Sequence, residues 1–319
     1  MPSFKTVARR ISEHAFGSTF DRALENSCSE TYPRFLFCWN RGLGDIALGL
    51  MPLFDLIRHT APSARISVIT REDLKSAFAL AGVEEVHTLH SLQRGQRINV
   101  ANACATLAIS RKDFVAVFSD PDPDRWLDER RAQFPPALLR NPIWDRYADR
   151  FLESFPGQIV IAAHLHSETA QHHGYMKDWL APAWTELFSR FRTNDLVQWV
   201  LLGDVAEPRF EGGNVTDLRG RTSLLELLSL IKNHCRILIA PDSGVLTMTY
   251  YLAVPFSIEV ISTWSNPRQG ILKQGCASPN PLLRHVPLFG AEEDVRNVPV
   301  ADVAAAVECA LARTLQPGT

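Results

Sequence analysis

The sequence predicts an α/β protein made of two Rossmann-like domains, each a parallel sheet with helices on both faces. Its 319 residues exceed one average domain and suit two domains of about 150 residues each. In the first half, short apolar runs alternate with helix-like segments, and the alternation starts again after an arginine-rich stretch. Such alternation is typical of parallel sheets. We therefore expect an N-terminal domain over 1–155 and a C-terminal domain over 156–319.

The first half carries the pattern of strand, glycine turn and helix. An apolar run over 35–39 predicts the first strand, and the apolar spacing of 46–59 predicts the helix that follows it. Before this strand, scattered apolar residues are compatible with an amphipathic helix laid over the domain. Further strands are expected at 65–70, 86–89 and 114–118.

The second half repeats the pattern. Strands are expected at 158–162, 197–202 and 237–240, and helices at 184–191 and 245–252. Ser223 and Glu226 form a capping-box signature, which predicts that another helix begins between them. We expect a terminal helix over 303–315 to pack back across the boundary onto the N-terminal domain.

Charge and cysteine usage narrow the class of protein. Lysine and arginine number 33 against 35 aspartates and glutamates, so the net charge of -2 offers no field for a polyanion, and we expect no nucleic-acid partner. Arginines gather between 125 and 150, which fits either a solvated helix face or a patch for an anionic acceptor or a membrane surface. Six cysteines without a C-x-x-C pair favour a reducing compartment.

No segment resembles a signal peptide, and no apolar stretch approaches the roughly 18 residues that a membrane span needs. These observations predict a cytoplasmic protein, with peripheral contact at the cytoplasmic face of the inner membrane left open.

The first glycine turn supports two interpretations. Residues Gly42-Leu43-Gly44-Asp45-Ile46-Ala47 satisfy G-x-G-x-x-A, the dinucleotide fingerprint, between a strand and a helix. The acid expected after the next strand comes late, at Glu72, so the turn also fits a purely structural role. Asp45 favours chemistry, because a carboxylate at a helix start beside the carboxyl ends of parallel strands is placed to meet a substrate.

The second turn runs from a strand through Asp242, Ser243 and Gly244 into a helix. Backbone amides of Ser243, Gly244 and Val245 would point outward at that helix start and suit a diphosphate without a Walker lysine. Asp242 would then help to bind the nucleotide, or would serve only as a helix cap.

Several segments occur in a recognisable order. They are Gly42-Leu43-Gly44-Asp45 with Pro52; Lys177-Asp178-Trp179 with Trp184; Leu201-Leu202-Gly203-Asp204 with Glu207; Leu218-Arg219-Gly220-Arg221 before the capping box; and Ala240-Pro241-Asp242-Ser243-Gly244 with Ala253-Val254-Pro255. Together they resemble glycosyltransferase family 9, the ADP-heptose:lipopolysaccharide heptosyltransferases. The resemblance covers residues 35–70 and 175–262, and it implies a GT-B fold, two Rossmann-like domains with a crevice between them.

The resemblance also implies roles. The nucleotide diphosphate would lie on the C-terminal domain between Lys177 and the amides after Asp242, and Glu207 would hold the ribose. The acceptor would belong to the N-terminal domain, where Asp45 would remove a proton from its hydroxyl. A lysine and a helix start neutralise a leaving diphosphate, so no metal and no cofactor is expected beyond the nucleotide-sugar donor, ADP-heptose by resemblance.

The chain departs from the family at two places. The family has a histidine that approaches the sugar nucleotide where this chain has Thr247, and its G-P-T is replaced by residues 262–268. Thr263 and Arg268, together with Trp264, stand where that segment would contact the substrate. These differences leave the donor sugar open.

Other polar clusters are weaker candidates. Asp120, Asp122 and Asp124 mimic a D-x-D metal site, but the intervening prolines favour an exposed acidic loop, so we assign no metal. His164 ends a strand near the expected crevice and is a candidate substrate contact; His166, His172 and His173 show no zinc spacing. Ser243 lacks the G-x-S-x-G frame of a hydrolase nucleophile.

Taken together, the sequence predicts an inverting glycosyltransferase for lipopolysaccharide biosynthesis. It would transfer a sugar, heptose by resemblance, from a nucleotide-diphosphate donor to a glycan, lipid-linked or protein acceptor, with Gly42 and Gly44 beside the substrate. The alternatives are a catalytically silent protein that binds sugar nucleotides or acts as a scaffold, a nucleotide-sugar epimerase, and an NAD-dependent dehydrogenase.

Overall fold

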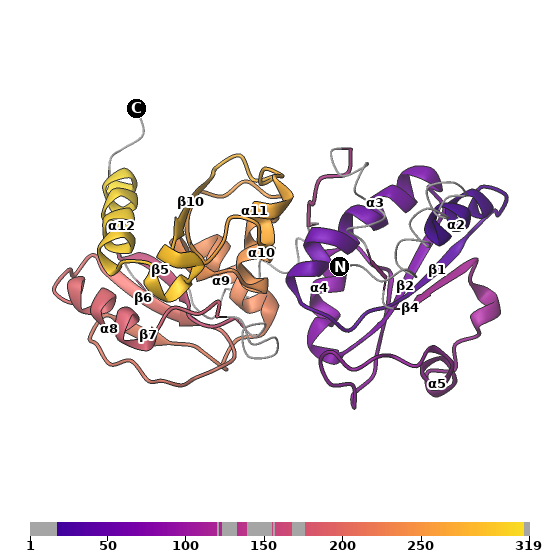
Figure 1. The fold of residues 1–319 in the computed structure, drawn as a ribbon, viewed down its shortest axis with the longest axis horizontal. Helices are drawn as coiled ribbons and strands as arrows, with labels where there is room; N and C mark the ends of the chain where they lie inside the picture. Colours follow the sequence, from indigo (N-terminus) through magenta and orange to yellow (C-terminus); the bar gives the residue numbers. More distant parts are fainter. Residues whose placement is uncertain are drawn as a thin grey trace. The chain divides into compact units, whose positions relative to one another are not determined.

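The computed structural model describes residues 18–119, 121–122, 133–138, 155, 157–167 and 176–315. The chain divides into two compact units (Figure 1): unit 1 comprises Met1–Arg41 and Asp45–Pro136, and unit 2 comprises Gly42–Gly44 and Ala137–Thr319. The division therefore falls earlier than the boundary expected near 155. The reason lies at Leu138, which is fully buried and exchanges backbone hydrogen bonds with Tyr251 (2.8 Å) and Ala253 (3.2 Å) of unit 2.

Unit 1 is built on a four-stranded parallel sheet of order β3-β2-β1-β4. The strands expected from the sequence are all present, with ends that differ by one or two residues. In chain order its elements are α2 (Thr19–Ser27), β1 (Arg34–Cys38), η1 (Ile46–Leu50), α3 (Met51–Thr60), β2 (Arg65–Thr70), η2 (Glu72–Leu74), α4 (Lys75–Leu80), β3 (Glu85–Thr88), α5 (Val100–Thr106), η3 (Arg111–Asp113) and β4 (Ala116–Ser119).

The central strand β1 is buried on both faces, as its uninterrupted apolar run predicted. Successive side chains of a strand point to opposite faces. Phe37 packs against Phe54 of α3 and Phe118 of β4, with ring centroids 5.1 Å and 4.9 Å away. On the other face, Leu36 and Cys38 join a cluster with residues of α5. Helices thus pack on both faces of this sheet.

Unit 2 holds a six-stranded parallel sheet of order β10-β9-β8-β5-β6-β7. Counted from its own first strand, this is the order 6-5-4-1-2-3, the doubly wound order of Rossmann folds. Its elements are β5 (Ile159–His164), α8 (Ala181–Arg190), β6 (Val197–Leu202), β7 (Val215–Asp217), α9 (Leu224–His234), β8 (Cys235–Pro241), α10 (Gly244–Tyr250), β9 (Ile258–Trp264), α11 (Gly270–Gln274), β10 (Leu283–Phe289), η5 (Ala291–Glu293), η6 (Val295–Asn297) and α12 (Val300–Leu315).

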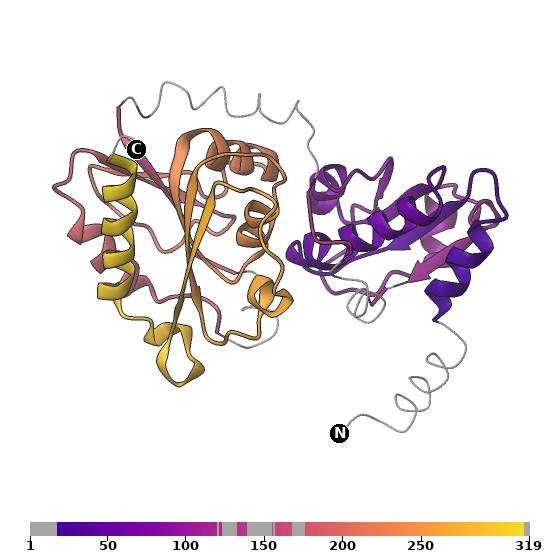
Figure 2. The same cartoon turned by 90° about the horizontal axis from the view of Figure 1, so that it is seen from above.

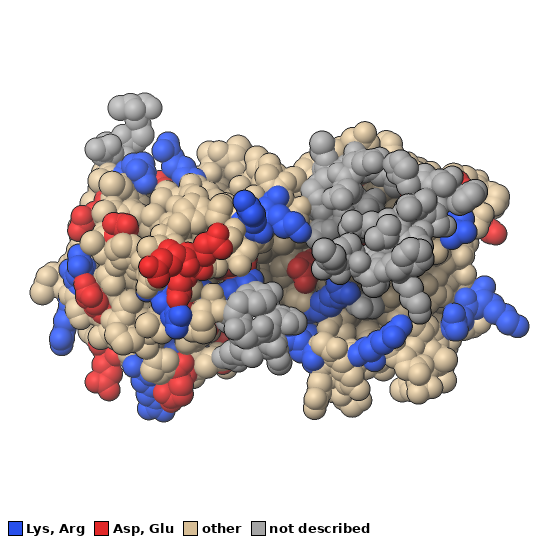
Figure 3. Space-filling view, in the orientation of Figure 1, with Lys and Arg blue, Asp and Glu red and all other residues tan. Residues whose placement is uncertain are grey.

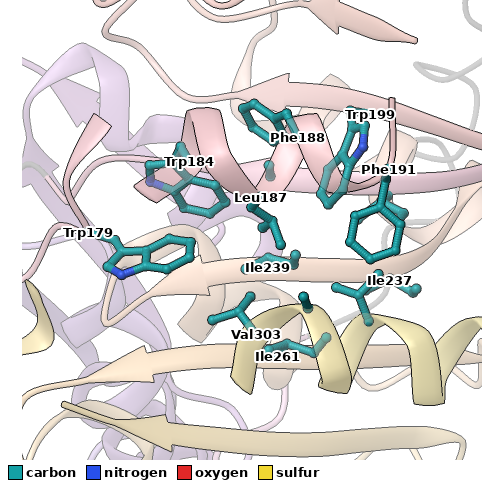
Figure 4. Close-up of a cluster of buried hydrophobic side chains, with 14 of the residues drawn as sticks. Trp179, Trp184, Leu187, Phe188, Phe191, Trp199, Ile237, Ile239, Ile261 and Val303 are labelled. Atoms are coloured by element: carbon teal, nitrogen blue, oxygen red, sulfur yellow. The ribbon is translucent and has the colours of Figure 1, made fainter. Parts of the chain in front are cut away.

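Helices cover both faces of the unit 2 sheet (Figure 2), with α8 and α12 on one side and α9 and α10 on the other. The contact of the first layer with the sheet is aromatic: Trp184 and Phe188 of α8 join one buried cluster with Trp199, Ile237 and Ile239 of the sheet (Figure 4). Phe188 lies 4.9 Å from Trp199 between ring centroids. Burying one such phenylalanine stabilises the fold by about 1.5–3 kcal/mol.

Two local expectations concern helices α9 and α12. The capping box at α9 is confirmed, since the Ser223 amide donates to Glu226 Oε2 (2.8 Å) and the Glu226 amide donates to Ser223 Oγ (3.4 Å). The terminal helix α12 packs on the sheet of unit 2, and its expected contact with the N-terminal domain stays a prediction. Its apolar residues, Val303 and Val307 among them, enter the core of unit 2, and Arg313 donates to Glu259 of β9 at 2.8 Å.

Candidate functional site

Both glycine turns predicted from the sequence lie where ligands bind in doubly wound sheets. In such a sheet the connections leave in opposite directions from two neighbouring strands, and a crevice forms outside their carboxyl ends. In unit 2 these strands are β5 and β8. Strand β5 ends at His164, and β8 ends at Pro241, the residue before Asp242. In unit 1 they are β1 and β4, and Asp45 follows the loop that leaves β1.

A buried ion pair lies at the carboxyl end of the unit 2 sheet, directly after β8. Lys177 Nζ donates to Asp242 Oδ2 at 2.5 Å, and the two side chains are only 13% and 9% exposed. A buried carboxylate and a buried ammonium are each costly to desolvate unless they are paired. The sequence singled out both residues, and the structure brings them together across 65 positions of chain.

Lys177 is held in place through the two residues that follow it in the chain. Asp178 accepts a hydrogen bond from the backbone N–H of Ser167 at 2.5 Å, which ties it to the exit of β5. Trp179 is buried and its indole N–H donates to Val298 O at 3.0 Å. These contacts supply the physical reason for the Lys-Asp-Trp order, which the sequence indicated only by resemblance.

Ser243, in the turn after β8, is the N-cap of helix α10. Its Oγ accepts from the Leu246 amide at 3.2 Å, whereas the Asp242 carboxylate turns to Lys177. The helix-cap alternative for Asp242 is therefore wrong. Gly244 and Val245 begin the seven-residue helix α10. Thr247, also in α10, is 2% exposed and its hydroxyl donates to Ser243 O at 3.0 Å, so this group serves the helix backbone.

His164 ends β5 and is nearly inaccessible to solvent. Burial lowers its pKa to about 4, with a smaller opposing effect of Asp178, so the imidazole is neutral at physiological pH. Within the described residues its Nδ1 has no hydrogen-bond partner. Gly203 packs against the ring at a φ of 125°, and a Cβ there would lie 3.3 Å from His164 Nε2. A buried, neutral imidazole can donate or accept a hydrogen bond but is a weak proton acceptor at pH 7.

Glu207 lies in the loop after β6, at the same edge of the unit 2 sheet. Its side chain is 75% exposed and pairs with Arg209 at 3.7 Å. The loop itself is fixed by Arg219, whose fully buried guanidinium donates to Pro208 O at 2.7 Å and to both carboxylate oxygens of Asp217. Burial would raise the pKa of Asp217, but hydrogen bonds from Arg219 lower it below its usual value. Sequence reasoning assigned Arg219 no role beyond the motif.

Asp45 is exposed and begins an unusual helix. It makes no capping hydrogen bond in the following turn, so the helix-cap interpretation of its carboxylate is not supported. The turn Ile46–Leu50 is a π-helix, in which the Met51 amide donates to Ile46 O, five residues back. Pro52 supplies the reason: it has no amide for the carbonyl of Leu48, and its ring needs a wider turn.

Gly42 and Gly44 lie in the loop that precedes this π turn. The loop starts at Asn40, which is buried and donates to the backbone carbonyls of Gln93 and Gln96 at 2.6 Å and 2.8 Å. Arg71 of unit 1 donates to Asn40 Oδ1 at 3.1 Å. The exits of β1 and β2 are thereby joined to the loop after β3.

Solved structures resemble this chain over nearly its whole length. Heptosyltransferase II of Escherichia coli, named as an ADP-heptose lipopolysaccharide heptosyltransferase, aligns with TM-score 0.60 and 15% identity, covering 89% of this chain and 100% of that one. A family 9 glycosyltransferase of Veillonella parvula aligns with TM-score 0.58 and 15% identity over 88% and 98%. These matches decide the architecture. The chain has the GT-B fold.

A third structure with the same fold is TibC, described as an iron-containing dodecameric glycosyltransferase from enterotoxigenic E. coli. It aligns with TM-score 0.54 and 13% identity, covering 90% of this chain and 80% of that one. No protein-family model and no curated protein sequence matches this chain. At these identities the comparisons establish the fold.

The remaining predicted contacts of this GT-B protein lie on β9 and just after it. Thr263 pairs in register with Pro241 of β8, one residue before Asp242, and is 1% exposed. Within the described residues its hydroxyl has no hydrogen-bond partner. Arg268 is exposed in the segment between β9 and α11. Thr263 is therefore buried beside the end of β8, whereas Arg268 is open to solvent.

Several predicted features fall outside the described residues. They are Asp120 and Asp124 of the acidic loop, His172 and His173, and the arginine cluster between 125 and 150. Among the residues that are described, no group of three or more His, Cys, Asp or Glu side chains is arranged to hold a metal. In the same part of the chain no helix is long and apolar enough to cross a membrane.

The cysteines are thiols, and charges of both signs share the surface (Figure 3). All six thiols are free, and burial raises the pKa of Cys38 to about 12, which makes it an unreactive core residue. Acidic and basic side chains intermingle on the face of unit 2 seen in Figure 3. This mixture agrees with the near-zero net charge.

Proposed function

We propose that this GT-B protein is an inverting glycosyltransferase that uses a nucleotide-diphosphate sugar. The observation that carries the proposal is the Lys177–Asp242 ion pair at the switch point of the unit 2 sheet. A lysine held at this place is suited to a diphosphate, because crevices at switch points bind nucleotides and an ammonium attracts phosphate. The donor is ADP-heptose by resemblance, and the acceptor is a glycan or lipopolysaccharide-type molecule.

In this proposal unit 2 binds the donor. Lys177 contacts the diphosphate together with the backbone amides of Ser243, Gly244 and Val245, and Glu207 holds the ribose. The fixed setting of Lys177 supports this role, since Asp178 and Trp179 anchor its backbone and Asp242 orients its ammonium. A preorganised charge stabilises the leaving diphosphate without reorganisation during the reaction.

Asp45 of unit 1 is the proposed general base. Its carboxylate takes the proton of the acceptor hydroxyl while that oxygen attacks the anomeric carbon of the donor sugar. The bond from the anomeric carbon to the diphosphate oxygen breaks, and the nucleotide diphosphate leaves with its electron pair. Attack from the face opposite the leaving group inverts the configuration. The exposure of Asp45 supports this role, because an exposed carboxylate is accessible to substrate.

His164 is the alternative base, and the structure supports it less well. Its low pKa and burial make it a poor proton acceptor at pH 7. We assign it a neutral hydrogen bond to donor or acceptor instead. Thr263 and Arg268 remain proposed substrate contacts on the donor side.

A second candidate function is a silent protein that binds sugar nucleotides without transferring the sugar. Thr247 favours this candidate, because it replaces the family histidine and directs its hydroxyl to Ser243 O inside α10. A contact to the sugar is then missing at this position. The two candidates share donor binding and differ in turnover.

The deciding experiment incubates the protein with radiolabelled sugar nucleotides of ADP, UDP, GDP and CMP and a panel of glycan and lipid-linked acceptors. Transfer of label with release of the nucleotide diphosphate is the expected result. Binding without transfer would support the silent protein, and epimerised sugar or a nicotinamide requirement would replace the proposal with an epimerase or dehydrogenase. A thermal-shift screen of the same nucleotides selects the donor class first, since a ligand that binds only the folded state raises Tm.

A further inference from the structure

The carboxylate of Asp242 is enclosed on two sides, by Lys177 and by the first residue of α11. Its Oδ2 accepts from Lys177 Nζ at 2.5 Å. Its Oδ1 faces Gly270 so closely that a Cβ added to this glycine would lie 2.3 Å from it. Real Cβ atoms do not approach an oxygen to that distance, so residue 270 has to be glycine for the carboxylate to keep its position.

A side chain at position 270 would also meet Trp264. The same added Cβ would lie 3.1 Å from Cη2 of Trp264, which is 1% exposed. The indole of Trp264 is fixed from behind, because its N–H donates to Ser262 Oγ at 2.6 Å. Ser262 is itself fully buried and lies 2.6 Å from His285 Nε2. Since the tryptophan cannot yield, the group that an added methyl displaces is the carboxylate.

We infer that Gly270 is a positioning residue, which holds Asp242 in place and through it sets the ammonium of Lys177. Segment 262–270 then has a defined task in this chain: it forms the wall against which the ion pair is fixed. Loss of this wall turns Asp242 away and breaks the pair, leaving Lys177 poorly oriented. The consequence for donor binding rests on the proposed function, whereas the effect on the ion pair does not.

The chain offers a matched control at the other end of the same short helix. Gly275 follows the last residue of α11 and has a φ of 62°, comparable to the 45° of Gly270. An alanine is strained at either position because both lie in the left-handed region. A Cβ at Gly275 meets no atom within 4 Å. The pair Gly270→Ala and Gly275→Ala therefore separates the contact with Asp242 from the cost of the backbone conformation.

The first test measures the ion pair without any ligand. Wild type and both variants are treated with limiting acetic anhydride, and acetylation of Lys177 is quantified by mass spectrometry relative to the exposed Lys112. Lys177 is 13% exposed and ion-paired in the wild type, so its acetylation should be low there and in Gly275→Ala. Gly270→Ala should raise it several-fold. Equal acetylation in the two variants would overturn the inference.

The second test asks whether Gly270 acts through Asp242. ADP affinity is measured by calorimetry for Gly270→Ala, for Asp242→Ala and for the double variant. Gly270→Ala should weaken ADP binding about tenfold, the size of one lost charge-assisted contact, and should have no further effect once Asp242 is alanine. A full additional loss in the double variant would mean that Gly270 acts elsewhere and would refute the inference.

Two further outcomes are also decisive. If Gly270→Ala does not fold, the double variant should be about as stable as Asp242→Ala alone, because the oxygen that the methyl meets is gone. A double variant less stable than Asp242→Ala by more than Gly275→Ala loses relative to wild type would overturn the inference. If wild-type protein does not bind ADP, the proposed donor class fails. The acetylation of Lys177 still tests the positioning role in that case.

Discussion

The two glycine turns of this protein have similar sequences, but the aspartate of one is buried and that of the other is exposed. In unit 2, Asp242 is buried, paired with Lys177 and enclosed by Gly270. In unit 1, Asp45 is exposed at the start of a π turn. An enclosed carboxylate is suited to orienting a neighbouring charge, and an exposed one is suited to exchanging a proton with a substrate. The comparison therefore assigns binding to one turn and proton transfer to the other.

The difference arises from the residues that surround each turn. Ser243 caps α10, which releases Asp242 from that duty, and a lysine anchored by Trp179 meets the carboxylate. In unit 1, Pro52 widens the first turn of the helix, and Asp45 stands just before it. Similar local sequences thus acquire different roles from their packing.

The largest expected effect comes from Asp45→Asn. The amide keeps the shape of the side chain but cannot take a proton, so kcat should fall by ~10²–10⁴, the usual contribution of a general base. Donor affinity should barely change, because the donor is proposed to bind unit 2. Steady-state kinetics and calorimetry with ADP measure the two quantities. A stable variant with wild-type kcat would remove Asp45 from the mechanism.

Next in size is the loss of the lysine. Lys177→Met should weaken nucleotide binding by about 1–3 kcal/mol, the range of a charge-assisted contact. It should also lower Tm, because it leaves the carboxylate of Asp242 buried without its cation. Adding Asp242→Asn to this variant should restore stability but not affinity. Lys112→Met, at an exposed lysine, is the control, and unchanged ADP affinity in folded Lys177→Met would contradict the donor site.

Pro52→Ala tests the π turn of unit 1. Alanine restores an amide for the carbonyl of Leu48, so the turn can close as an α-helix, which would rotate Asp45 by roughly 100° about the helix axis. We expect kcat to fall about tenfold, since small misplacements of reacting groups cost rate, while Tm stays within a few degrees of wild type. Pro62→Ala, in the turn after α3, should change neither. A wild-type kcat in Pro52→Ala would separate the π turn from function.

A smaller effect is the pH dependence that His164 gives to unit 2. Burial holds its pKa at about 4 in the folded state, against about 6.5 when unfolded, so the unfolded chain binds more protons between these values. The stability contributed by the neutral imidazole is complete above about pH 6.5 and is lost as the pH falls toward 4. Tm should therefore drop less steeply with acid in His164→Gln than in wild type.

The control for this titration is His90→Gln, which changes an exposed histidine of unit 1. His285 has the same lowered pKa of about 4 through burial and accounts for part of the slope that remains in His164→Gln. Identical slopes in wild type and His164→Gln would show that His164 is not buried in its neutral form.

The smallest expected effect is that of chelation. If Lys177 and the start of α10 meet the charge of the leaving group, EDTA should leave turnover nearly intact. TibC, which shares the fold, is described as containing iron, so metal-depleted protein should be assayed with and without added Fe²⁺, Mn²⁺ or Mg²⁺. An absolute requirement for one of these ions would overturn the proposal that Lys177 and the start of α10 neutralise the leaving diphosphate without a metal. The acidic loop at Asp122 would then be the candidate metal site.

Much of this fold could be predicted because its determinants are local. Apolar runs buried on both faces predicted strands such as β2 and β6 at their observed bounds, and the capping box placed the start of α9. Strand β9 (Ile258–Trp264) was given no bounds from the sequence, and strands β7 and β10 were not anticipated. β7 has only three residues, and β10 is an edge strand interrupted by Pro287 and polar residues, so neither carries an uninterrupted apolar run.

The sequence by itself determined which residues carry charge and where each turn interrupts the alternation of strand and helix. The tertiary structure alone decided that Lys177 meets Asp242, that Trp264 and Gly270 close the space around that carboxylate, and that Arg219 clamps the loop of Glu207. Helices and strands repeat about every 3.6 and 2.0 residues, and the spacing of apolar residues in the sequence shows these periods directly. Contacts between residues 28 or 65 positions apart depend on the order of strands in the sheet, and that order is fixed only when the whole unit packs.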